Sequence, residues 1–289
     1  MEHQKIKLFG NRDFSENFDM TLNFIKLNYG AILRGICILI PLILIFVFLT
    51  PNTQDIAASY SYDDIWGTYA EIFTLNYIIS FFLSVICTFL IYLYVIAYMA
   101  LYAKSPDGVV KSADVWSKVL NALLPTFIAS IIFGILVGIG AMLCLIPGII
   151  LYVYFGFYIY VYVNEDRSMM DSFTRSLDLV KNNWWITFGY GLIFALLIFI
   201  GRLIFAIPSF LTGLGSSLEI EFLSSDIFFY IVTLISGVGD LMLLPILYMA
   251  MGVMYYSHRN KLEGLDMESE IDNIGNDNQT IQNINEYKL

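Results

Sequence analysis

The sequence has few charged residues: they make up 14% of the 289-residue chain, where a soluble domain has about 25%. Hydrophobic residues make up 58%, and they stand in long unbroken runs. A run of about 18 or more apolar residues is long enough to cross the hydrocarbon core of a bilayer. Strands of a membrane barrel would alternate apolar and polar residues instead. The sequence therefore predicts an all-α, polytopic transmembrane helical bundle.

Histidine and cysteine are also scarce. His3 and His258 are the two histidines, and both fall outside the predicted spans. An intramembrane di-iron oxygenase would need a cluster of histidine ligands, and neither a His-Glu-x-x-His motif nor a Ser–His pair is available within the membrane. The three cysteines, Cys37, Cys87 and Cys144, lie in apolar runs and are typical of packing residues rather than disulfides. We predict no metal, no cofactor and no catalytic activity.

The apolar runs predict about six spans. They lie at residues 31–50, 73–102, 122–144, 149–164, 186–207 and 227–256. The domain division is a cytoplasmic segment at 1–30, the six-span membrane domain at 31–257, and a mostly disordered tail at 258–289. Pro147 and Gly148 are typical of a turn, so the third and fourth spans are predicted to form a tight helical hairpin.

The basic residues set the orientation. All of the 15 lysines and arginines except Arg202 fall in segments on one side of the predicted spans. Loops that face the cytoplasm carry an excess of such residues. The distribution fits an even number of spans, and it predicts a bacterial cytoplasmic membrane protein with both termini in the cytoplasm.

A weak internal repeat has an offset of 155 residues. It aligns Phe18, Leu22, Lys26, Asn28 and Tyr29 with Phe173, Leu177, Lys181, Asn183 and Trp184. Apolar residues are three or four positions apart in both stretches, which is typical of an amphipathic helix. Such a helix can lie in the interface with tryptophan at headgroup level. The stretch at 110–121 has a similar place before the third span, which suggests three units of interfacial helix plus transmembrane hairpin.

The repeat also supplies candidates for lipid contact. They are Lys26, Asn28, Lys181, Asn183, Trp184 and Trp185. Interfacial basic residues bind anionic headgroups, and the alternative is that the lysines serve only to set topology. The expected partners are the lipid bilayer and either anionic lipids or other membrane proteins, and we predict no nucleic-acid partner.

Asp240 and Arg202 are the intramembrane polar candidates. Asp240 lies inside the sixth span, where an ionisable group is costly and usually faces the protein interior or a wet cavity. It is either part of a proton or ion relay or a structural contact near the outer interface. Arg202 lies in the fifth span, where it can reach the outer headgroups or pair with Asp240. We predict that the two side chains approach each other.

Two further patterns have a functional and a structural interpretation. Tyrosines recur every fourth residue in the second and the fourth span, at Tyr94, Tyr98 and Tyr102 and at Tyr154, Tyr158 and Tyr162. Each set lines one helix face, either as a polar track for a solute or as packing. Gly134 and Gly138 form a small-xxx-small pattern that permits close helix approach.

Three local motifs carry a resemblance to a known family. They are the Leu-Ile-Pro-Gly turn at 145–148, the segment 172–185 that enters the fifth span, and the segment 255–266 that leaves the last one. Together they resemble the membrane domain fused to some bacterial glycerophosphodiester phosphodiesterases and its stand-alone relatives. In that family the activity resides in a separate soluble barrel, for which this chain has no segment. The resemblance therefore implies a membrane fold and no activity.

The sequence leaves three functional hypotheses open. The first is a non-catalytic protein that organises the bilayer or partner proteins. The second is a transporter or channel-like protein for a lipid or small hydrophobic solute. The third is an enzyme whose chemistry the sequence does not reveal. A polar cavity at the middle of the membrane would favour transport, and a dry, packed bundle would favour a structural role.

Overall fold

The computed structural model describes residues 5–50, 74–218, 220–223 and 225–265. These residues form helices joined by short turns. In chain order they are α1 (Phe14–Ile36), the 3-10 helix η1 (Cys37–Leu39), α2 (Ile40–Leu49), α5 (Leu75–Lys104), α6 (Ser112–Leu143), α7 (Leu145–Phe155), α8 (Tyr158–Glu165), α9 (Met169–Val180), α10 (Trp184–Ser217) and α11 (Asp226–Glu263). Six helical stretches of the described chain are long and apolar enough to cross a membrane. The predicted all-α fold with six such helices is confirmed. The predicted disordered tail lies outside the described residues from 266 onward.

The first span and the helix predicted before it form one rod, Phe14–Leu49. Asp13 begins it with a capping box, in which its carboxylate accepts from the Glu16 N–H and the Glu16 carboxylate accepts from the Asp13 N–H. Such reciprocal bonds satisfy the free N–H groups of the first turn. The only interruption is η1, which directly precedes Pro41 in the first turn of α2. The helix predicted before the first span is therefore present, but no turn separates it from the span.

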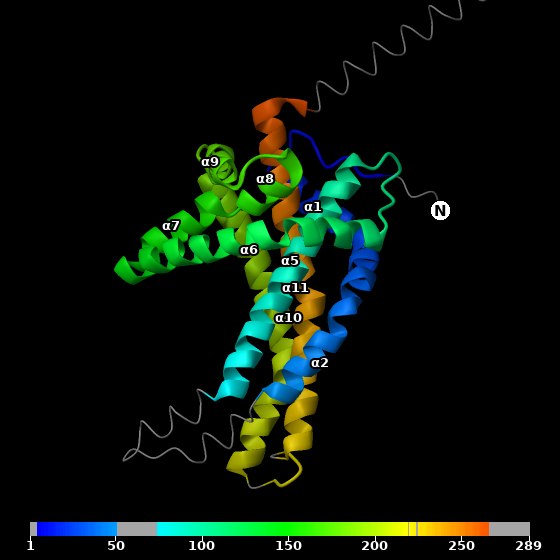
Figure 1. Ribbon diagram of the computed structural model, residues 1–289, viewed down its shortest axis with the longest axis vertical. Coiled ribbons are helices and arrows are strands. Elements are labelled where there is room, and N and C mark those ends of the chain that lie inside the picture. The colour runs from blue at the N-terminus through cyan, green and yellow to red at the C-terminus, as the bar shows by residue number, and fades with distance from the viewer. Residues whose placement is uncertain (1–4, 51–73, 219, 224, 266–289) are drawn as a thin grey trace, which may run out of the picture.

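Four helices run along the length of the molecule: α2, α5, α10 and α11 (Figure 1). The α5–α6 turn, α9 and the end of α11 lie together at the upper end in this view. The end of α2, the start of α5 and the α10–α11 turn lie at the lower end. The basic segments of the described chain thus gather at one end. This is the arrangement that the sequence predicted from an even number of spans.

The helices α6 and α7 form the predicted hairpin, but they run across the bundle rather than along it (Figure 1). The turn between them, at Cys144, lies to the side and not at the lower end, where α10 is joined to α11. The base of the hairpin is fixed at the upper end, where Val115 and Val119 are buried and Trp116 Nε1 donates to the Gly35 carbonyl at 3.0 Å. Hydropathy gives the length of an apolar helix and not its direction, so this arrangement could not be predicted.

The glycines that allow close helix approach are not the predicted ones. A methyl group added at Gly134 or Gly138 would meet no atom within 4 Å. The close approach lies at the hairpin turn instead, where a Cβ on Gly148 would stand 2.9 Å from the Cα of Ala141. The backbones of α6 and α7 therefore meet because residue 148 lacks a side chain.

We expect Gly148→Ala to destabilise the hairpin by about 1–3 kcal/mol, because overpacking against backbone forces the two helices apart. Gly138→Ala is the matched control in the same hairpin, and it should leave stability unchanged or slightly raised. Thermal unfolding of the purified protein in detergent measures both. Equal melting temperatures for the two variants would contradict the observed packing.

The upper half of the bundle is filled by tyrosines. Tyr94, Tyr98 and Tyr102 are all buried, and Tyr94 packs directly against Gly35, where an added Cβ would overlap its hydroxyl. In the second set, the Tyr158 hydroxyl lies 2.7 Å from the Ser130 hydroxyl. The packing interpretation of these tyrosines is supported, since they fill the core rather than line an open path.

A buried carboxylate joins α8, α9 and α11 at the upper end. The side chain of Glu165 is only 3% exposed. Its partners are Arg167 Nε at 3.0 Å, Arg175 Nε at 3.0 Å, Arg259 Nε at 3.7 Å and the Tyr255 hydroxyl at 2.8 Å. Glu263 extends the network by pairing with both Arg175 and Arg259. Two of the motifs that carry the family resemblance, 172–185 and 255–266, thus meet at one ionic cluster.

Candidate functional site

Asp240 and Arg202 form an ion pair across α10 and α11. Arg202 Nε lies 2.7 Å from Asp240 Oδ1, which confirms the predicted approach. Asp240 stands 14 residues after the first residue of α11, or about 21 Å along the helix axis. Arg202 stands 18 residues into α10, or about 27 Å along it. The pair therefore lies far from either end of its helices, within their apolar stretch.

A cavity of about 370 Å³ adjoins this pair, between α2, α5, α10 and α11. Its polar lining consists of Ser84, Thr88, Ser209, Thr212, Thr233, Ser236 and Asp240. Apolar side chains such as Phe46, Ile91 and Leu241 complete the walls. Seven of the sixteen residues that line the cavity thus carry a hydroxyl or a carboxylate, although the four helices are apolar enough to span a membrane.

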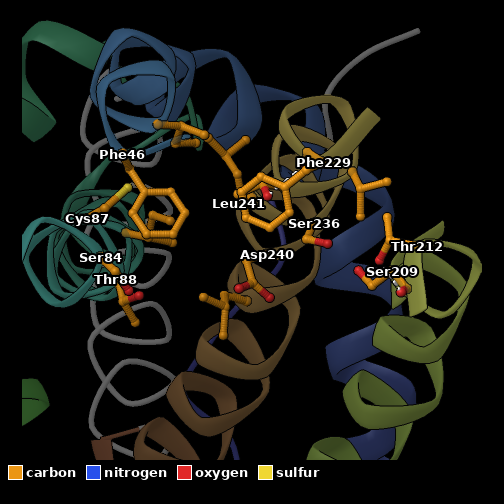
Figure 2. A pocket seen from close by; sticks show the side chains of 16 residues that line it. Phe46, Ser84, Cys87, Thr88, Ser209, Thr212, Phe229, Ser236, Asp240 and Leu241 are labelled. Atoms are coloured by element: carbon orange, nitrogen blue, oxygen red, sulfur yellow. Dashed lines mark hydrogen bonds between the residues drawn. The ribbon is translucent and has the colours of Figure 1, made fainter. Parts of the chain in front are cut away.

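Figure 2 shows how the polar residues are placed. Asp240 stands near the middle, between the α5 wall with Ser84 and Thr88 and the α10 wall with Ser209 and Thr212. Its carboxylate is therefore directed into the cavity between these helices. One carboxylate oxygen pairs with arginine, so the carboxylate has further acceptor capacity.

Several hydroxyls in the cavity have hydrogen-bonding capacity to spare. Thr233 donates to the Phe229 carbonyl at 2.9 Å, within its own helix. By contrast, the hydroxyls of Ser84, Thr88 and Ser236 form no hydrogen bond with another residue in the described part of the chain. Because polar groups in an apolar region seek partners, these hydroxyls are suited to water or to a bound solute.

The cavity ends toward the upper half of the bundle. Ile91 and Leu244 line it, and Tyr248, one turn beyond Leu244, packs its ring against that of Tyr92, the residue after Ile91, with centroids 4.7 Å apart. The Tyr160 hydroxyl donates to the Tyr248 carbonyl at 2.7 Å. These three tyrosines thus form a packed aromatic layer next to the cavity, on its upper side.

The lipid candidates near α10 line a second hollow, a groove of about 660 Å³. Lys181, Asn183, Trp184 and Trp185 come from the α9–α10 turn and the start of α10. The facing side is the start of α7, including Ile146. The groove thus has a cationic and amide-bearing end and an apolar side.

The groove follows a separate amphipathic helix. The helix α9 is capped by Ser168 and ends before the turn that leads into α10, so the prediction of a helix before the fifth span is confirmed. Lys181 at its end donates to Asp178 Oδ1 at 2.9 Å. This hydrogen bond lowers the pKa of the Asp178 carboxyl below its usual value.

The corresponding residues of α1 have different surroundings. Lys26 is exposed. Asn28 is buried at 4% exposure and accepts from the Tyr98 hydroxyl at 2.9 Å, so its prediction as an interfacial lipid residue is wrong. It shares the buried face of α1 with Phe24 and Ile32. The repeat aligned Asn28 with Asn183 by residue type alone. In α1 this position lies on the helix face that packs against the bundle.

His258 was placed outside the spans by sequence and lies inside the bundle. The helix α11 continues to Glu263, and the His258 side chain is buried against Phe157 with Nε2 2.8 Å from the Thr187 hydroxyl. The predicted boundary of the tail at 258 is therefore several residues too early. Among the residues that the structure describes, no cluster of three or more His, Cys, Asp or Glu can hold a metal.

A family model for a domain of unknown function, DUF7847, matches residues 72–258, well over half of the chain. The chain belongs to the DUF7847 family. No curated protein and no solved structure matches it. The DUF7847 segment contains the Arg202–Asp240 pair, the groove, and the α5, α10 and α11 walls of the cavity. The resemblance to phosphodiesterase membrane domains stays a prediction.

Proposed function

We propose that this DUF7847 protein is a membrane carrier that binds a small amphiphilic solute in the cavity at Asp240. The observation that carries the proposal is the cavity itself, a space between apolar helices into which a carboxylate and six hydroxyl-bearing residues are brought together. The hydroxyls of Ser84, Thr88 and Ser236 and the remaining acceptor capacity of Asp240 support a bound polar group, because polar groups without partners are costly in an apolar region. The role is binding and passage rather than catalysis.

The shape of the cavity favours a carrier over an open channel. In this proposal the packed tyrosines beyond Leu244 close one end of the cavity, so a solute that enters it cannot continue without a rearrangement of this layer. Carriers in general bind their substrate near the middle of the membrane and expose the site to one side at a time. The solute that fits has one or two hydrogen-bonding groups, for the carboxylate and hydroxyls, and an apolar part.

The proposed setting is the cytoplasmic membrane of a bacterium, with both chain ends on the cytoplasmic side. It is supported by the basic residues, which gather at the upper end of the described chain. In this orientation the cavity lies in the half that faces away from the cytoplasm, and the tyrosine layer faces the cytoplasm.

A second role, organisation of the bilayer or of partner proteins, is favoured by the α6–α7 hairpin. Its turn extends away from the bundle (Figure 1) with Met142 91% exposed and Leu143 80% exposed. Large exposed apolar surfaces mark membrane or protein contacts. The two roles do not exclude each other, since they use different parts of the molecule.

Cys87 offers a direct test, because its thiol lines the cavity. In a Cys37→Ser, Cys144→Ser background in lipid vesicles, Cys87 should react with a small water-soluble methanethiosulfonate, because the cavity holds water and opens on one side. Ser236→Trp, which fills the cavity from the opposite wall, should slow this reaction by about tenfold or more, the effect of removing water access. Mass spectrometry of the labelled protein gives the rate.

The two other cysteines are the controls. Cys37 and Cys144 are exposed, and in variants that keep only one of them, with the other two cysteines replaced by serine, the labelling should not respond to Ser236→Trp. If Cys87 reacts only after denaturation, the cavity is dry and the carrier proposal fails.

A further inference from the structure

We propose that the groove between the start of α7 and the start of α10 binds an anionic phospholipid, with the phosphate at Lys181 and the acyl chains along α7. No described residue of the ion pair or of the solute cavity lines this groove, so the proposal stands apart from the carrier function. The groove lies between α7 and the start of α10, and α9, which leads into α10, lies at the end of the molecule that carries the basic segments (Figure 1).

The polar end of the groove is suited to a phosphate. Lys181 supplies a positive charge, and Asn182 and Asn183 supply amide groups. The helix α10 begins directly after them without a side-chain cap, so the N–H groups of its first turn are free to bind an anion. These are three independent sources of attraction for a negative group.

Trp184 adds an observation of a different kind. Its side chain lines the groove, and its indole N–H is buried with no hydrogen-bond partner in the described part of the chain. A buried indole N–H usually has a partner. A phosphate or glycerol oxygen of a lipid would supply one after a turn of the indole ring toward the groove, because the N–H itself is enclosed in the structure.

The remainder of the groove is suited to acyl chains and not to a soluble anion. Ile146 and Ile150 of α7 form its other side, and both are exposed. Trp185 at the rim is 77% exposed, as is typical of tryptophan at the headgroup level of a membrane. A cationic end joined to an apolar wall matches one lipid molecule, whereas free phosphate would use only the first part.

The test uses the full chain purified in a neutral detergent and measures bound lipid by native mass spectrometry. Titration with phosphatidylglycerol should give a one-lipid adduct at lower concentration than titration with phosphatidylcholine. Lys181→Gln should weaken the phosphatidylglycerol adduct by about fivefold, as expected for one interfacial basic residue. Trp184→Phe, which removes the N–H and keeps the ring stack on Phe188, should weaken it as well.

Two matched variants distinguish a loss of lipid binding at the groove from a general effect on the folded protein. Lys26→Gln removes the lysine that the repeat pairs with Lys181 but lies outside the groove, so it should leave binding unchanged. Asp178→Asn removes the acceptor that Lys181 now uses, so it should tighten binding of the anionic lipid. Equal loss in Lys26→Gln and Lys181→Gln would overturn the site, because the effect would then be general surface charge.

A third arm separates lipid from free anion. Millimolar inorganic phosphate should not displace the phosphatidylglycerol adduct, because it gains nothing from the apolar wall. Displacement by phosphate, or equal binding of phosphatidylcholine, would overturn the assignment to an anionic phospholipid.

Discussion

Replacing Asp240 with asparagine is expected to lower the stability of the protein in the membrane by about 3 kcal/mol. The substitution leaves Arg202 charged within an apolar region without its partner at 2.7 Å. A lone charge at the centre of a spanning helix costs about 2.5–3.5 kcal/mol on insertion scales, and removal of one member of a desolvated pair has a similar cost. Each side chain is 47% exposed, to lipid or to water in the cavity, so the remaining charge is partly solvated and the loss of stability should not exceed this range.

The reverse substitution gives the matched measurement. Arg202→Gln leaves Asp240 charged and should destabilise the protein by a similar amount. The double variant Arg202→Gln, Asp240→Asn is neutral and keeps a hydrogen-bonding pair, so it should be more stable than either single variant, which corresponds to a coupling energy of about 3 kcal/mol or more. Thermal unfolding in lipid nanodiscs measures all four proteins. A coupling energy near zero would show that the two residues are separately solvated.

The same double variant separates stability from function. It leaves no unpaired charge, but it removes the carboxylate from the cavity. Solute binding should therefore remain lost while folding recovers. A single variant cannot make this distinction, because loss of folding and loss of the site occur together.

The apolar runs, the even number of spans and the Arg202–Asp240 contact could be predicted because each follows from the position of residues along helices. The direction in which each helix runs, and whether two helical segments are joined without a turn, could not be predicted. The segment at 14–30 has the same pattern as α9, yet it is continuous with its span, and Asn28 is buried as a consequence. The cavity was missed in part: its polar residues are single serines and threonines on four helices, and only the tertiary contacts bring them together with Asp240. The groove could not be predicted either, because it forms only where the crosswise hairpin brings α7 next to the start of α10.

Replacing Glu165 with glutamine should destabilise the upper end of the bundle by about 3–5 kcal/mol, the usual cost of removing one partner from a buried ionic cluster. The Glu165 side chain is 3% exposed and faces three arginines, so glutamine keeps the shape but leaves those positive charges with less compensation. Glu263 has a side chain that is 25% exposed, and Glu263→Gln should cost only about 1 kcal/mol or less, because water screens a partly exposed pair.

The location of the effect can be measured as well as its size. Because Glu165 joins α8 to α9 and α11 through Arg175 and Arg259, its loss should release α9 first. Hydrogen exchange in α9 should rise in Glu165→Gln well below the temperature of global unfolding, while exchange at the Arg202–Asp240 level of α11 stays as in the parent protein. A uniform rise along all the helices would instead mean that the cluster does not stabilise α9 locally.

Since α9 leads directly into the lipid groove, release of α9 should also weaken the phosphatidylglycerol adduct although Glu165 does not line the groove. That dependence would connect the ionic cluster, which gathers the motifs at 172–185 and 255–266, to the surface that faces the membrane.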